Sequence, residues 1–120
     1  MKAGMIWVAL VGTFACNSAL ADGNELLRQC ETAVAHSSNR SLNSEYDTGY
    51  CFGTINGVVS TMVTMNEYLL PQEKVCFPDD IKQSQGARIV VKYLEGHPAS
   101  LHRSGPFLVM AAFQHSYRCK

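Results

Sequence analysis

SEYDTGYCFGTINGVVSTMVTMNEYLL, residues 44–70, is the stretch that decides the fold of this chain. Its apolar residues recur in alternating steps of four and three positions, the spacing of one buried face of a helix. Against a helix stands Asn56-Gly57 between β-branched residues, a strong hairpin signal over a few residues. The helical pattern extends much further than a hairpin would, so we favour a helix. Its members are Cys51, Ile55, Val58, Met62, Met65 and Leu69.

Three glycines share one face of this predicted helix. Gly49, Gly53 and Gly57 recur at four-residue spacing, and each costs roughly 1 kcal/mol relative to alanine inside a helix. Such a face is explained if the backbone of another helix packs closely against it. We therefore predict that Gly53 and Gly57 are helix-packing positions, with a poorly formed helix as the alternative.

Three shorter helices are predicted around this segment. The first covers residues 25–35 with Asn24 as its N-cap. The other two follow Pro71, which ends the long helix: one starts at Asp79-Asp80, and one runs from residue 99 or 104 to residue 116. The sequence predicts an all-α protein, a small bundle of about four helices.

The N-terminus has the features of a signal peptide. Lys2 precedes an uncharged, mostly apolar run over residues 5–15, which is too short to span a bilayer, and Ala19-Leu20-Ala21 matches a cleavage site. We predict that residues 1–21 are a signal peptide cleaved after Ala21. Residues 22–120 then form the exported domain, with no membrane contact after cleavage. A buried N-terminal helix or a retained anchor is the alternative.

Cysteines indicate two disulfides. Cys16 is lost with the signal peptide, and the remaining even number suits a small exported domain. Consecutive helices with short loops tend to be antiparallel neighbours. Cys30 in the first helix can therefore meet Cys51 near the start of the second. Cys76 precedes the third helix and Cys119 follows the fourth, so these two ends coincide as well. We predict the pairs Cys30–Cys51 and Cys76–Cys119.

Composition and motifs exclude several function classes. The chain has 120 residues and formal net charge +0, which argues for one domain and against an electrostatic nucleic-acid binder. Paired cysteines leave no thiol for a Cys–His nucleophile. His115 and Cys119 lack the partner spacing of a zinc site. We therefore expect a binding or inhibitor module, not an enzyme, with no catalytic residue, metal or cofactor.

A set of ordered motifs runs through residues 22–120. They are Tyr50-Cys51-Phe52-Gly53-Thr54-Ile55-Asn56-Gly57, Cys76-Phe77-Pro78, Val90-Val91-Lys92-Tyr93-Leu94-Glu95-Gly96-His97-Pro98 and Tyr117-Arg118-Cys119. Together they resemble the Rap/Tai family of type VI secretion amidase immunity proteins. The resemblance implies a small helical periplasmic protein, often a homodimer, that occludes the active-site cleft of a peptidoglycan amidase effector. It also favours the helical interpretation of residues 44–70.

The residues that would contact the effector do not follow from this resemblance, because the matching positions are cysteines, glycines and core residues. Exposed loops are the expected contact surface, here residues 36–43 and 72–74. Inhibitors concentrate binding energy in a few residues, often aromatic or Arg. We therefore predict Arg40 and Tyr68 as partner-binding residues. The alternative function is a periplasmic stress or chaperone-like helical protein without an effector partner.

Overall fold

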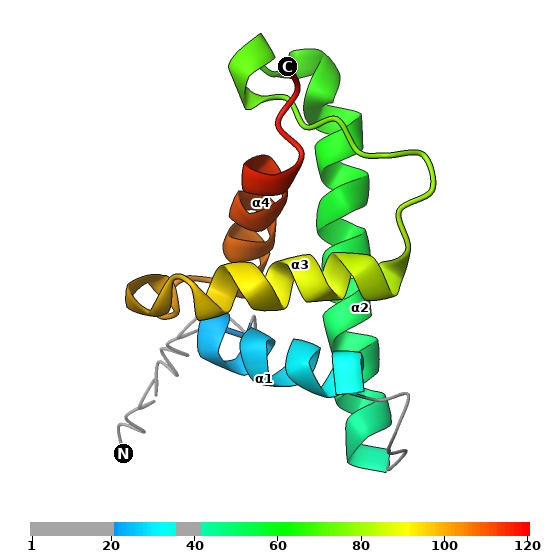
Figure 1. The fold of residues 1–120 in the computed structure, drawn as a ribbon, viewed down its shortest axis with the longest axis vertical. Coiled ribbons are helices and arrows are strands. Elements are labelled where there is room, and N and C mark those ends of the chain that lie inside the picture. The colour runs from blue at the N-terminus through cyan, green and yellow to red at the C-terminus, as the bar shows by residue number, and fades with distance from the viewer. Residues whose placement is uncertain (1–20, 36–41) are drawn as a thin grey trace, which may run out of the picture.

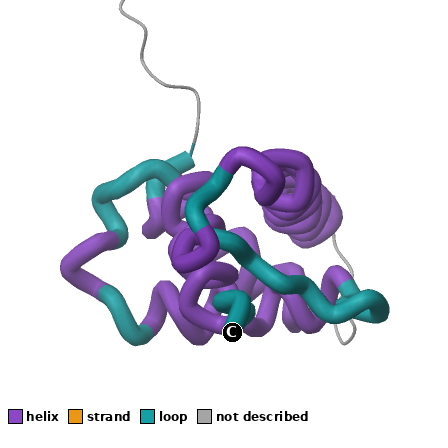
Figure 2. Tube along the Cα trace, turned by 90° about the horizontal axis from the view of Figure 1, so that it is seen from above, coloured by secondary structure: helices purple, strands orange, loops and turns teal. Residues whose placement is uncertain are grey.

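The computed structural model describes residues 21–35 and 42–120, and it confirms the all-α fold (Figure 1). The described chain contains helices and loops and no strand, as Figure 2 shows from above. Among these residues no helix combines the length and the apolar character needed to span a bilayer. The helices are α1 (Gly23–Ala35), α2 (Leu42–Met65), α3 (Gln83–Glu95) and α4 (Gly105–Ser116), with short 3-10 helices η1 (Asn66–Tyr68), η2 (Pro71–Glu73) and η3 (Pro98–Ser100).

The long helix α2 forms one side of the molecule, and both α1 and α3 cross it (Figure 1). A single core lies between the four helices. Phe113 of α4 is its largest fully buried side chain, and the ring of Phe77 meets it edge-on with 5.4 Å between the centroids. The other core residues with no exposed surface include Leu26, Cys30, Cys51, Ala87, Val90, Leu94, Val109 and Ala112.

The helical interpretation of residues 44–70 is correct over most of its length, and the Asn56-Gly57 hairpin does not form. Cys51, Ile55 and Met62 are buried as the pattern predicts, whereas Met65, another member of the predicted buried face, is 43% exposed. The helix nevertheless ends at Met65 and not at Leu70. The chain tightens there into η1, because the side chain of Asn66 bonds the backbone of Val75.

Two predicted helix starts are wrong. Helix α1 begins at Gly23, and its cap is Asp22, whose Oδ1 accepts the Glu25 N–H at 3.0 Å, whereas Asn24 donates to the Leu101 carbonyl. Helix α3 begins at Gln83, because Asp79-Asp80 form a turn. The Ile81 N–H donates to the Pro78 carbonyl across that turn. For α4, the later of the two predicted starts is correct.

Both disulfides pair as predicted. Cys30–Cys51 joins α1 to α2 with 5.1 Å between the Cα atoms, and neither cysteine is exposed. Cys76–Cys119 joins the connector before α3 to the segment after α4, with 5.0 Å between the Cα atoms. Each bridge restricts the unfolded chain and contributes about 2–4 kcal/mol to the free energy of unfolding. Cys30–Cys51 lies within the first half of the chain, and Cys76–Cys119 lies within the second half.

Candidate partner-binding surface

Exposed apolar side chains gather where α2 ends. We call residues 63–74 the α2 tip. Its large apolar side chains include Tyr68, which is 77% exposed, and Leu70, which is 57% exposed. The α2 tip extends beyond α3 at the same end of the molecule as the C-terminus (Figure 1). Apolar groups left in water are typical of a surface that a partner covers. Tyr68, which we predicted as a partner-binding residue, is thus exposed, and its role in binding stays a prediction.

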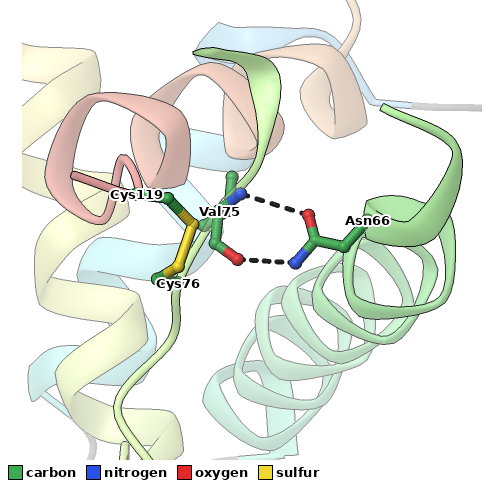
Figure 3. Close-up of a disulfide and its surroundings, with 4 residues drawn as sticks. All are labelled: Asn66, Val75, Cys76 and Cys119. Carbon is green, nitrogen blue, oxygen red and sulfur yellow. Dashed lines mark hydrogen bonds between the residues drawn. A yellow bond between two sulfur atoms is a disulfide. The ribbon is translucent and has the colours of Figure 1, made fainter. Parts of the chain in front are cut away.

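Asn66 holds the α2 tip in shape. Its Nδ2 donates to the Val75 carbonyl at 2.6 Å, and its Oδ1 accepts the Val75 N–H at 3.1 Å (Figure 3). One side chain thus satisfies both backbone groups of Val75, as a neighbouring strand would. The Val75 side chain is itself buried in the core. The base of the tip is consequently fixed to the body of the protein.

The segment after α4 secures the other side of the tip. The Cys76 N–H donates to the Tyr117 carbonyl at 2.8 Å, and the Cys119 N–H donates to the Lys74 carbonyl at 3.2 Å. The Cys76–Cys119 disulfide joins the same two segments covalently (Figure 3). Because the tip is held from both sides, Tyr68 is presented by a preorganised backbone, which lowers the entropy cost of binding.

One flank of the tip is polar. Glu73 accepts the Leu70 N–H through Oε2 at 3.3 Å, while the Glu73 N–H donates to the Leu70 carbonyl at 2.8 Å. A hollow of about 240 Å³ lies beside it, between the predicted contact segment 72–74 and α4. Lys74 and Arg118 supply positive charge there and Glu73 supplies negative charge. The α2 tip therefore combines exposed apolar side chains with an adjacent group of side chains of both charges. Protein interfaces commonly have such an apolar centre and a polar rim.

Arg40, the second predicted contact residue, lies outside the described residues, as do residues 36–41 of the predicted contact loop. The structure therefore does not place Arg40 relative to Tyr68. At the opposite end of α2 from the tip, Tyr46 is 68% exposed. Tyr46 is not among the predicted contact residues, because one tyrosine in a helical pattern carries no signal of its exposure.

A charged cluster near the start of α2 was also missed. The Arg28 guanidinium donates to Glu25 at 2.6 Å and to the nearly buried Asp47 at 2.7 Å. The hydrogen bonds from Glu25 and Asp47 raise the pKa of the Arg28 guanidinium above its ordinary value. The three-residue spacing of Glu25 and Arg28 was visible in the sequence, whereas the approach of Asp47 depends on how α1 crosses α2. This cluster ties those two helices together.

The glycine prediction is wrong for the described part of the chain. A Cβ atom built at Gly49, Gly53 or Gly57 meets nothing within 4 Å, so no helix of the described chain packs against this face. The close contacts are made by other glycines. At Gly23 a Cβ would lie 2.8 Å from the Leu101 carbonyl oxygen, and at Gly105 it would lie 2.9 Å from the Ala21 carbonyl oxygen. Both are helix starts that sit directly against a neighbouring segment.

The described residues show no grouping of three His, Cys, Asp or Glu side chains able to hold a metal ion. A model for a family described as Rap1a immunity proteins matches residues 22–119. The chain belongs to the Rap1a immunity protein family. This confirms the resemblance drawn from the ordered motifs. No curated protein and no solved structure matches the chain significantly.

Membership of this family gives the chain an immunity role, and an immunity role implies binding to an effector partner. Proteins of this kind are generally not enzymes. The two disulfides fit a protein exported to an oxidising compartment.

Proposed function

We propose that this protein is a periplasmic immunity protein that binds a type VI secreted peptidoglycan amidase and occludes its active-site cleft. The family match supports the immunity role. The α2 tip supports occlusion, because it projects from the body and carries the highly exposed Tyr68. A projecting segment with exposed apolar side chains and a fixed backbone can fill a cleft, and it loses little conformational entropy on binding.

The same proposal places the protein in the periplasm after removal of residues 1–21. Two features of the described domain support this boundary. Asp22 would become the first residue and would keep its capping bond to the Glu25 N–H. The family match also begins at residue 22. Cleavage after Ala21 would thus keep the cap of α1, while the Gly105 N–H at the start of α4 would lose the Ala21 carbonyl that accepts it at 2.8 Å in the full chain. N-terminal sequencing of the periplasmic protein checks the boundary.

The test of the function is neutralisation of a cell-wall amidase encoded in the same genome. The amidase is directed to the periplasm and co-expressed with the full-length chain or with a chain lacking residues 1–21. We expect protection from lysis only when the signal peptide is present. The purified proteins should also form a stable complex in isothermal titration calorimetry, and amidase activity should fall as the complex forms.

If no amidase of that genome is bound or neutralised, the amidase-immunity proposal is wrong. A periplasmic stress or chaperone-like protein without an effector would then be the better interpretation. If the amidase is bound but its activity is unchanged, occlusion of the cleft is wrong although the effector partnership stands.

A further inference from the structure

The hollow beside the α2 tip is lined only by polar side chains. Gln72, Glu73 and Lys74 line it from the tip, and Gln114 and Arg118 line it from α4 and the segment that follows. Its volume is about 240 Å³, whereas one molecule of liquid water occupies about 30 Å³. The hollow therefore has room for the end of one polar side chain together with several water molecules.

The two cations of the hollow have no counter-ion within the described chain. The ion pairs found among the described residues both belong to Arg28, so Lys74 and Arg118 form none there. The carboxylate of Glu73 is the one negative group in the lining, and its Oε2 accepts the Leu70 N–H at 3.3 Å. The hollow consequently keeps an excess of positive charge that the described chain does not neutralise.

Backbone contacts fix the two cationic residues relative to each other. Val75 and Arg118 form an antiparallel bridge, and the Cys119 N–H donates to the Lys74 carbonyl at 3.2 Å. The Cys76–Cys119 disulfide joins the same two segments (Figure 3). Two cations held around one hollow repel each other, and an anion placed between them is attracted to both. The fold thus prepares a site for a negative group before any partner arrives.

The side chains of the hollow suit a carboxylate. The planar guanidinium of Arg118 can bind both oxygens of one carboxylate through two parallel hydrogen bonds, and the ammonium of Lys74 adds a second charge. The side-chain amides of Gln72 and Gln114 can donate to the remaining lone pairs. The hollow adjoins the exposed apolar side chains of the α2 tip, so a partner that covers the tip also reaches the hollow.

We propose that this hollow receives the carboxylate of an Asp or Glu side chain at the rim of the amidase cleft. This inference rests on the proposed function, and it names the chemical group that the partner must offer. Complementary charges across an interface speed the encounter and fix the register of the two surfaces. The apolar side chains of the tip would then contribute most of the affinity, while Lys74 and Arg118 select a partner with a matching acidic residue.

The test removes single charges and measures the Kd for the purified amidase by titration calorimetry, with the disulfide-bonded protein taken from the periplasm. Lys74→Gln and Arg118→Gln should each raise Kd by about tenfold. Glu73→Gln keeps an acceptor for the Leu70 N–H and removes the negative charge of the hollow, so it should lower Kd by about twofold or more. The control is Lys92→Gln, an exposed position that lines a different hollow and should leave Kd within about twofold.

Salt provides a second measurement. Higher salt should raise the Kd of the wild type more steeply than that of the double variant with Lys74→Gln and Arg118→Gln, because screening weakens only the charge pairs that are present. Replacing the acidic residues of the amidase cleft rim one at a time should find one whose loss abolishes the effect of Arg118→Gln. Circular dichroism confirms that each variant keeps the helical content of the wild type.

The outcomes separate this inference from the function on which it rests. If the wild type binds the amidase and Lys74→Gln and Arg118→Gln bind it equally well, the carboxylate site is wrong and the effector partnership stands. A raised Kd for Glu73→Gln also overturns the carboxylate site, because the hollow would then receive a cation. A wild type that binds no amidase overturns both proposals.

Discussion

The glycines of this chain are of two kinds, those with open space and those packed closely against a neighbouring segment. The space available to a Cβ atom added at each glycine distinguishes them. Gly53 has nothing within 4 Å of that position. An alanine there would gain helix propensity without a clash. At Gly23 the Cβ would lie 2.8 Å from the Leu101 carbonyl oxygen and in steric conflict with Leu108. Since the clash involves backbone at the start of α1, the neighbouring segment would have to move.

We expect Gly53→Ala to raise the free energy of unfolding by about 0.5–1 kcal/mol. Gly23→Ala should lower it by about 1–3 kcal/mol through overpacking. Thermal unfolding followed by circular dichroism measures both changes. A lower melting temperature for Gly53→Ala would show that this face has a neighbour after all.

At the scale of the element, the side-chain amide of Asn66 supplies one of the attachments that hold the α2 tip. Asn66→Ala removes both bonds to the Val75 backbone. It should cost about 1–3 kcal/mol, because two partly buried backbone groups lose their partner. We also expect faster tryptic cleavage after Lys74, since the connector opens more often. Glu67→Ala, an exposed position in the same tip, is the control. Equal cleavage rates for the two variants would contradict the anchoring role of Asn66.

The two disulfides should differ in their access to reductant. Cys76 is exposed, whereas Cys30 and Cys51 have no exposed surface. Thiol exchange requires access to a sulfur atom, so brief treatment with dithiothreitol should open Cys76–Cys119 first. Alkylation followed by peptide mapping should then find label on Cys76 and Cys119 while Cys30–Cys51 remains linked. Labelling of Cys30 and Cys51 at the same rate would mean that the core opens as readily as the tip.

At the scale of the whole molecule, α2 offers a matched pair of tyrosines. Tyr68 at the tip and Tyr46 near the other end are similarly exposed, 77% and 68%. If the tip enters the amidase cleft, Tyr68→Ala should weaken binding by about 2 kcal/mol or more, and Tyr46→Ala should leave the affinity within about twofold. Titration calorimetry with the purified amidase decides this. The reverse order of effects would move the contact surface to the start of α2.

The sequence by itself determined the secondary structure class, the disulfides and the family. These depend on local periodicity and covalent chemistry, which are properties of each segment of the sequence. The spacing of Cys51, Ile55 and Met62, for example, indicates a helix regardless of which other helices pack against α2. The pairing of Cys30 with Cys51 followed from helices that are adjacent in the chain. The family likewise follows from the order of the motifs along the chain, which can be read without the three-dimensional structure.

Only the tertiary structure decided which surfaces have neighbours. Glycine spacing indicated a packed face at Gly53 and Gly57, but the packed glycines are Gly23 and Gly105. The bonds of Asn66 to Val75 close a loop whose shape no periodicity specifies. Burial of a helix face depends on the angle and position at which other helices cross it. That angle follows from the packing of the whole core, so a sequence pattern within one helix does not contain it.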